Sequence, residues 1–280
     1  MNNQKRTMAQ LQEHYEIEKE LASKLREATK EERRFLYTSL YNELFQRVPS
    51  HPQLTQKKSA ERTLEVVTQQ MKFLRRFLKK EYTLLEIGPG DCALSLELTR
   101  CVKQVFAIDV SDEIVKGLNS QPLNFKLHLS DGVSIPVAPG SIDIAYSNQL
   151  MEHLHPEDAL EQLRNINDSL TNGGIYICVT PNSLDGPHDI SRYFEDVAKG
   201  FHLKEYTRTE LVDLFMKTGF SSVKLYAGIK GFFVKIPLRI VMIVEMFLGN
   251  LPGKFRKRIA QSIPFRQLVG GVLVGVKLNR

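Results

Sequence analysis

The sequence predicts a doubly wound α/β protein with a seven-stranded, mostly parallel sheet, an N-terminal helical extension and a helical insert before the last strand. From Thr83 onward, short apolar runs alternate with helical patterns, which is typical of β-α-β units. Residues 1–82 show helical spacing without such runs. With 280 residues and 42% hydrophobic composition, the chain is long enough to bury a large core.

The predicted strands are short and rich in β-branched and aromatic residues. They cover residues 83–87, 105–108, 125–128, 142–146, 175–179, 223–226 and 271–278. Helical spacing predicts helices over 156–170, ended by the Asn172-Gly173-Gly174 turn, and over 207–218. We therefore expect strands and helices to alternate along residues 83–280, which form the main domain.

The N-terminal extension, residues 1–82, reads as three helices broken at Pro49 and Pro52. The third, roughly residues 59–80, places apolar side chains on one face, which suits docking against a larger body. We expect a helical cap that closes over a cleft rather than a coiled coil.

Charge is distributed unevenly along the chain. Residues 1–82 hold 17 basic and 11 acidic residues, a net charge of +6, and residues 227–280 hold 10 basic residues and one acidic residue, a net charge of +9. Residues 83–226 hold 11 basic and 20 acidic residues, a net charge of −9. Because the positive charge lies outside the segment with recognisable chemistry, we expect no nucleic-acid partner.

Residues 228–268 form an insert that a minimal α/β sheet does not require. It mixes apolar residues with lysine and arginine and is too interrupted to span a bilayer. Three interpretations stay open: internal packing, peripheral contact with an anionic membrane surface, and a homodimer face.

A glycine-rich turn follows the first predicted strand. Gly88-Pro89-Gly90 lies between that strand and a helix, where backbone N–H groups approach a ligand closely. Gly88-x-Gly90-x-x-Ala93 also satisfies the dinucleotide fingerprint. Glu86, two residues before the first glycine, would repel a pyrophosphate but accepts hydrogen bonds from a cationic ammonium, which favours a sulfonium amino-acid ligand.

Two further carboxylates follow the next two strands. Asp109 comes 21 residues after Gly88, where a carboxylate accepts both ribose hydroxyls of an adenosine group. Asp131 follows the third strand and is placed to accept from an adenine amine. Ligands of open α/β sheets bind at the carboxyl ends of the strands, where all three acids fall.

At these positions the sequence resembles the class I S-adenosylmethionine-dependent methyltransferases over about residues 83–226. The matching pieces are LLEIGPGDCALS, FAIDVS, LSDG, IDIAYSNQLMEHL, the turn at 170–174 and HLKEYTRTELVDLFMKTGF. The family usually has a third glycine where this chain has Cys92. The resemblance implies S-adenosyl-L-methionine as cofactor, held by Glu86, Gly88, Pro89 and Gly90 at the methionine end, Asp109 and Val110 at the ribose, Ser130, Asp131 and Gly132 at the adenine, and Asn148 at the mouth of the site.

Methyl transfer from a sulfonium needs alignment and water exclusion, and a hydroxyl acceptor also needs a base. His153 is the first candidate for that base, followed by His188 and His202. We expect O-methylation of a small-molecule or amphiphilic acceptor. We expect no metal, because histidines and carboxylates show no cluster at metal-ligand spacing along the sequence.

The N-terminal residues lack a continuous apolar stretch, so we expect a cytoplasmic protein, with membrane association through the insert left open. Two other functions remain as alternatives. One is a catalytically silent module that binds the cofactor or a partner. The other is a nicotinamide-dependent oxidoreductase, which Glu86 disfavours.

Overall fold

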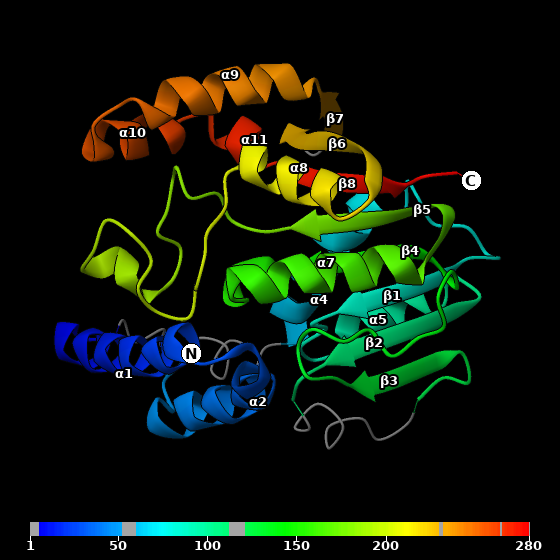
Figure 1. The fold of residues 1–280 in the computed structure, drawn as a ribbon, viewed down its shortest axis with the longest axis horizontal. Coiled ribbons are helices and arrows are strands. Elements are labelled where there is room, and N and C mark those ends of the chain that lie inside the picture. Colours follow the sequence, from blue (N-terminus) through cyan, green and yellow to red (C-terminus); the bar gives the residue numbers. More distant parts are fainter. Residues whose placement is uncertain (1–5, 52–59, 112–120, 230–231, 264, 280) are drawn as a thin grey trace.

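The computed structural model describes residues 6–51, 60–111, 121–229, 232–263 and 265–279. Its centre is one mixed sheet of eight strands in the order β3-β2-β1-β4-β5-β8-β6-β7 (Figure 1). The strands are β1 (Thr83–Ile87), β2 (Gln104–Asp109), β3 (Phe125–Leu129), β4 (Ile142–Asn148), β5 (Leu170–Val179), β6 (Phe220–Ile229), β7 (Phe232–Ile236) and β8 (Val272–Lys277). The α/β prediction is confirmed, with eight strands rather than seven.

Strands β3, β2, β1, β4 and β5 pair in parallel, and β8 pairs antiparallel with both β5 and β6. Ile87 at the end of β1 pairs with Ile108 of β2 and with Ser147 of β4. Because parallel strands end at the same edge, the loops after β1, β2, β3 and β4 meet there.

Helices cover both faces of the sheet. The helices α7 (Pro156–Ser169) and α8 (Arg208–Lys217) lie in front of it in Figure 1, and α4 (Ala60–Leu74) and α5 (Ala93–Leu98) lie behind. Alternate strand residues feed the two cores: Leu85 packs in the α7 and α8 core, whereas Leu84 packs with α4 and α5. The sheet therefore has a helix-covered core on each of its two faces, which confirms the doubly wound prediction.

The insert does not begin as a helix, so that part of the prediction is wrong. Residues 232–236 form β7, which pairs antiparallel with β6, Leu225 opposite Ile236. The sequence Phe-Phe-Val-Lys-Ile suits a strand because aromatic and β-branched side chains pack well on a pleated surface. Pro237 then ends the strand and caps α9 (Leu238–Gly249), which is followed by α10 (Gly253–Ala260) and α11 (Phe265–Val269).

The N-terminal extension supplies three described helices, α1 (Met8–Glu27), α2 (Lys30–Arg47) and α4. The first two separate at Ala28 and Thr29 rather than at a proline, because Thr29 caps α2 in a capping box with Glu32. The extension is also not one cap. Helices α1 and α2 lie on the side where the parallel strands end, whereas α4 packs on a sheet face (Figure 1).

A buried ion pair fixes α2 to the first turn of α7. Arg33 Nε donates to Asp158 Oδ2 over 2.6 Å, and both side chains are almost fully buried. Tyr37 Oη donates to the same Asp158 oxygen over 2.7 Å and accepts from the backbone N–H of His155. Removing one member of such a pair leaves an uncompensated buried charge, which is costly.

We therefore expect Asp158→Ala to lower the free energy of unfolding by about 3–5 kcal/mol, because Arg33 would remain buried without its main partner. Urea denaturation followed by circular dichroism measures this. The matched control is Glu157→Ala, which removes the exposed second partner of Arg33 and should cost under about 1 kcal/mol. Equal losses in the two variants would contradict the assigned role of the buried pair.

Candidate active site

The candidate site is built at the edge where the parallel strands end. The Gly88 N–H donates to the Ile108 carbonyl over 2.8 Å, which brings the loop after β1 against the end of β2. The Ser130 N–H donates to the Asp109 carbonyl over 2.9 Å and brings the loop after β3 to the same place. The predicted residues from three strands are therefore adjacent.

The loop after β1 adopts a backbone that favours glycine. Gly88 and Gly90 have φ of 70° and 62°. A Cβ on Gly88 would lie 3.2 Å from the Leu150 side chain, so the loop also approaches the segment after β4 closely. Cys92, at the start of α5, has φ of 59°, a left-handed backbone conformation that favours glycine. Pro89, between the two glycines, is buried.

Glu86 is buried beneath this loop, with 5% of its surface exposed, and accepts a hydrogen bond from the Ser95 hydroxyl. Burial, together with the nearby Asp91 and Asp109 carboxylates, raises the pKa of Glu86 to about 8, although the hydrogen bond from Ser95 acts in the opposite direction. The position is thus short of positive charge. A cationic ligand beside Glu86 would favour its ionised form.

Asp109 ends β2 and connects two loops. Its Oδ2 accepts from the Gly90 N–H over 3.4 Å, and its Oδ1 accepts from the Ser111 N–H over 3.0 Å. The carbonyl of the next residue, Val110, accepts from the Thr38 hydroxyl of α2 over 2.9 Å. The ends of β1 and β2 are therefore tied to each other and to the N-terminal helices.

Asp131 already has many partners. Its carboxylate accepts from the backbone of Val133 and Ser134, from the Ser134 hydroxyl and from Arg34 of α2. These bonds lower its pKa, although its partial burial acts in the opposite direction. An adenine amine would have to share an oxygen with one of these donors, so the assignment of Asp131 to adenine stays a prediction.

The other predicted residues of this loop and of β4 lie at the same edge. The Ser130 hydroxyl donates to the Ser134 carbonyl over 2.6 Å. A Cβ on Gly132, where φ is 87°, would lie 3.0 Å from the Tyr37 ring, so α2 covers this loop directly. Asn148 ends β4 and is partly exposed, and the following Gln149 has φ of 55°.

The predicted bases differ in their surroundings. His153 closes the short 3-10 helix η1 (Met151–His153), its Nδ1 lies 3.0 Å from the Phe201 carbonyl, and burial lowers its pKa to about 3. His188 Nε2 lies 3.0 Å from Asp185 Oδ1. Burial lowers the pKa of His188, but this bond, the Asp185 and Glu205 charges and the Asn182 carbonyl together raise it above its ordinary value. His202 Nδ1 lies 2.6 Å from Glu205 Oε1, and this bond raises its pKa against the effect of burial.

Sequence reasoning missed several residues that complete the site. Tyr41 of α2 stacks on Phe201, with ring centroids 4.8 Å apart, and meets His153 edge to face at 5.9 Å. Arg33, Arg34, Tyr37, Thr38 and Tyr41 lie at helical spacing on one side of α2, so the signal was present in the pattern. The sequence alone does not show which part of the protein this side of α2 contacts.

Two groups of side chains lie at metal-ligand spacing, which the linear sequence did not indicate. In each group the candidate ligand atoms all lie within 4.8 Å of one another. One group is His14, Glu18 and His51, and the other is Glu152, His153 and His202. The reason given for expecting no metal therefore does not hold once the chain is folded.

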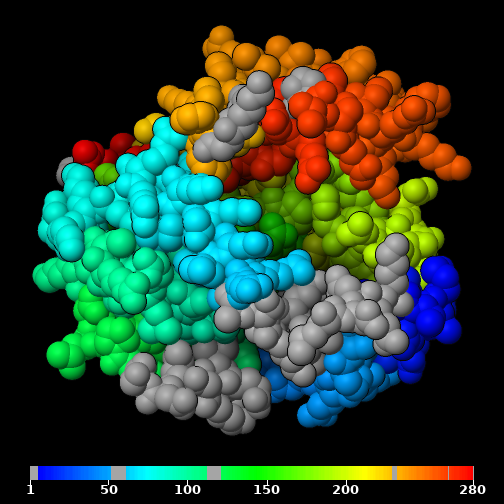
Figure 2. Space-filling view, turned by 180° about the vertical axis from the view of Figure 1, so that it is seen from behind, coloured from blue at the N-terminus to red at the C-terminus, as the bar shows by residue number. Residues whose placement is uncertain are grey.

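The surface has a recess that reaches the middle of the chain. Figure 2 shows a recess whose floor carries the green of the middle of the chain. Residues of α4, in cyan, and the orange and red C-terminal helices stand around it. The mid-chain segment is thus reachable from outside between elements of the N- and C-terminal regions.

Comparison with known proteins assigns the chain to a family. Residues 57–225 match the methyltransferase domain family, so the chain belongs to it. A search of curated protein sequences finds no significant match. The fold is that of class I S-adenosylmethionine-dependent methyltransferases, and the protein is a methyltransferase of this kind.

Several solved structures share the fold. A SAM-dependent methyltransferase from Archaeoglobus fulgidus has a TM-score of 0.52 at 16% identity, with 76% of this chain and 94% of that chain covered. Haemonchus contortus phosphoethanolamine N-methyltransferase 1, in complex with phosphoethanolamine and S-adenosylhomocysteine, has a TM-score of 0.60 at 13% identity. There the comparison covers 90% of this chain and 50% of that chain.

Proposed function

We propose that the protein transfers a methyl group from S-adenosylmethionine to a hydroxyl of a small-molecule or amphiphilic acceptor. The cofactor part of the proposal rests on the positions of two carboxylates at the glycine loop. Glu86 is buried beneath the loop, and Asp109 accepts a hydrogen bond from the Gly90 N–H. Carboxylates on both sides of a close-approach backbone suit a ligand with a cationic amino acid at one end and ribose hydroxyls at the other.

In this arrangement Glu86, Gly88, Pro89 and Gly90 face the methionine end. Asp109 and Val110 face the ribose, Ser130, Asp131 and Gly132 face the adenine, and Asn148 lines the mouth of the site. The bound cofactor supplies a methyl group already activated on sulfur. The protein's residues hold it, align the acceptor and exclude water, for which α2 is placed directly over the loops after β2 and β3.

The acceptor's hydroxyl proton needs a destination as the new oxygen–carbon bond forms. His153 and His188 remain the proposed groups for this step. Both follow strands of the parallel sheet at the edge that holds the cofactor residues, His153 after β4 and His188 after β5. O-methylation is proposed because an imidazole would be superfluous for an acceptor that carries no acidic proton.

The C-terminal helices support an amphiphilic acceptor. Helix α9 exposes Ile240, Ile243 and Phe247, spaced three and four residues apart, while Val241 and Leu248 are buried below. The one acidic residue after Ile229, Glu245, is buried and accepts from Asn182 and from the backbone of Arg208 and Thr209. The charged groups that this region exposes are basic. No described helix is long and apolar enough to cross a membrane.

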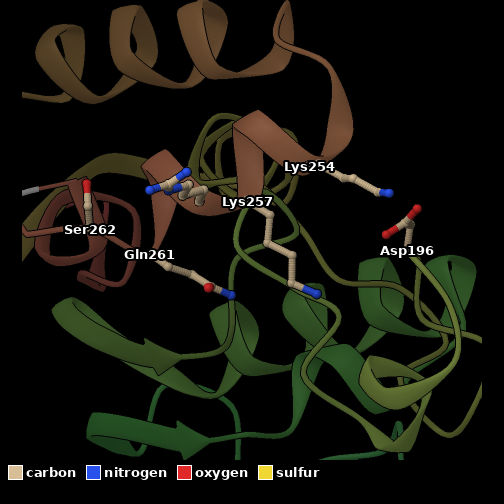
Figure 3. A pocket seen from close by; sticks show the side chains of 6 residues that line it. Asp196, Lys254, Lys257, Gln261 and Ser262 are labelled. Atoms are coloured by element: carbon tan, nitrogen blue, oxygen red, sulfur yellow. The ribbon is translucent and has the colours of Figure 1, made fainter.

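A basic recess lies at α10, the helix that follows α9 and contacts it. A pocket of about 370 Å³ is lined by Lys254, Lys257 and Arg258 of α10, with Asp196, Gln261 and Ser262 (Figure 3). In Figure 1, α10 lies on the side where the parallel strands end, as do α1 and α2. Exposed apolar side chains next to basic ones suit an anionic lipid surface, which we propose as the partner of residues 228–268.

The cofactor proposal predicts micromolar calorimetric binding of S-adenosylmethionine and S-adenosylhomocysteine, and about 10–100-fold weaker binding to Asp109→Ala, because hydrogen bonds to a charged group are lost. Asp213→Ala, an exposed acid on α8, is the matched control. Tight NADH binding without adenosylmethionine binding would establish the oxidoreductase alternative instead. Cofactor binding without turnover on any acceptor would point to the silent module.

The raised pKa of Glu86 predicts pH-dependent cofactor binding. Below about pH 8 the free protein holds a proton on Glu86, which faces Asp91 and Asp109 and lies near Tyr146. A cationic ligand favours the ionised form, so binding releases this proton, and affinity should rise with pH by up to about tenfold per unit below pH 8. Calorimetry in two buffers of different ionisation enthalpy measures the release.

Glu86→Gln is the control for this experiment, because glutamine keeps the shape of the side chain but does not titrate. In the variant, position 86 can no longer release a proton when the ligand binds. The variant should release fewer protons and lose affinity mainly at high pH. Identical proton release in the variant and the unmodified protein would remove Glu86 from the methionine end of the site.

The membrane proposal predicts that the protein floats with vesicles of phosphatidylglycerol and phosphatidylcholine, but not with phosphatidylcholine alone. Replacing Ile243 and Phe247 together by serine should weaken binding at least about tenfold, because each buried side chain contributes roughly 1.5–3 kcal/mol. Phe35→Ser, an exposed aromatic on α2, is the control. A stable dimer in light scattering, broken by the double variant, would favour the homodimer instead.

A further inference from the structure

Three side chains from two segments that are distant in sequence converge near the edge that holds the predicted cofactor residues. Glu152 and His153 belong to η1 after β4, and His202 belongs to the long loop between β5 and α8. Each offers a ligand atom within 4.8 Å of the other two. Leu150, which packs against Gly88 of the cofactor loop, lies only two residues before Glu152.

The hydrogen bonds of the two histidines fix which ring nitrogen is available. His153 Nδ1 donates to the Phe201 carbonyl over 3.0 Å, since a carbonyl only accepts. His202 Nδ1 donates to Glu205 Oε1 over 2.6 Å. Both neutral rings therefore keep a lone pair on Nε2. This pattern, with one ring N–H held by a carbonyl or carboxylate, is typical of histidines that bind metals.

The third side chain has an unused oxygen. Glu152 is fully buried, its Oε2 accepts from the Thr180 hydroxyl over 2.8 Å, and its Oε1 has no hydrogen-bond partner. A buried carboxylate oxygen without a partner is costly and calls for an occupant. The buried guanidinium of Arg208 donates to the Thr180 carbonyl, and no hydrogen bond joins it to Glu152 among the described residues.

The second group, His14, Glu18 and His51, differs in this respect. Arg6 donates to His14 Nδ1 over 2.7 Å, so His14 Nε2 carries the proton and donates to Glu18 Oε1 over 2.8 Å. Glu18 Oε2 accepts from the Phe201 N–H. Both ring nitrogens of His14 and both carboxylate oxygens of Glu18 therefore already have hydrogen-bond partners within the protein. Neither residue has an unpartnered atom to offer a metal.

We propose that Glu152, His153 and His202 bind a divalent transition-metal ion of the zinc type through one carboxylate oxygen and two imidazole nitrogens. The ligand set suits such ions, and three protein ligands leave at least one position open. This inference rests on the proposed function for its role, in which the open position takes the acceptor's hydroxyl oxygen.

At that position the metal would weaken the acceptor's O–H bond. Because His153 would then be a ligand, it would not take the proton, which would pass to His188, the other proposed base, or to solvent. The oxygen then forms a bond to the methyl carbon as the sulfur–carbon bond breaks, and S-adenosylhomocysteine leaves with the electron pair on its sulfur. The metal undergoes no change of oxidation state, so no oxidant or reductant is needed.

The test is binding of Zn²⁺ and Co²⁺ to the full chain, previously stripped with a chelator, followed by calorimetry and by the visible absorption of Co²⁺. We expect one equivalent bound, with a Co²⁺ spectrum of low-coordinate nitrogen and oxygen ligation. His202→Gln and Glu152→Gln should each weaken binding at least about tenfold. His14→Gln, in the other group, should leave it unchanged.

Three outcomes would overturn the proposal: no stoichiometric binding to the unmodified protein, binding lost in His14→Gln but kept in His202→Gln, or a Co²⁺ spectrum of a hexahydrate-like surface site. The spectrum of the unmodified protein decides even where a variant fails to fold. S-adenosylmethionine affinity, measured separately without metal, distinguishes failure of the metal site from failure of the proposed methyl transfer.

Discussion

The parallel pairing of β1 with β2 and β4 is the constraint on which the site depends. It brings the ends of three strands to one edge and aligns Ile87 with both Ile108 and Ser147. The glycine loop, Asp109 and the segment from Asn148 to His153 are far apart in sequence, yet each begins where a paired strand ends. The positive φ of Gly88 and its contact with Leu150 show how little space this edge leaves. A side chain in place of that glycine would separate two segments that the site requires together.

Helix α2 completes this edge through a single face. Arg33, Tyr37 and Tyr41 are spaced four residues apart and so lie on one face of the helix. Arg33 contacts the start of α7, Tyr37 lies against the loop at Gly132, and Tyr41 contacts His153. The flanking Arg34 and Thr38 bond Asp131 and the Val110 carbonyl. The ordering of the loops after β2 and β3 therefore depends on the helical extension as well as on the sheet. The buried Arg33–Asp158 pair explains why this helix keeps its position.

Local patterns in the sequence were sufficient for most of the sheet, because apolar runs bounded by helical segments determine strands with little ambiguity. They were insufficient for β7, whose mixture of aromatic and basic residues also suits a helix, until pairing with β6 selects the strand. Asp109 was found because it follows a strand directly. The contact of Arg34 with Asp131 and that of His202 with Glu152 were missed for one reason. Both form only through tertiary packing, and Arg34 is 97 residues from Asp131 in the sequence. Linear spacing carries no information on such contacts.

The backbone of Phe201 connects the two groups of histidines and glutamate. Its N–H donates to Glu18 of α1, and its carbonyl accepts from His153 of η1. Its ring stacks on Tyr41 of α2. One residue thus links both N-terminal helices to the segment after β4. The group around Glu18 closes its own hydrogen bonds and serves to hold α1 in place. The group around Glu152 leaves an oxygen unpaired, although Phe201 and Glu205 hold both of its imidazoles in fixed orientations. Side chains oriented so firmly around an unsatisfied atom are arranged for a ligand rather than for packing, which is why the two groups, alike in composition, have different roles.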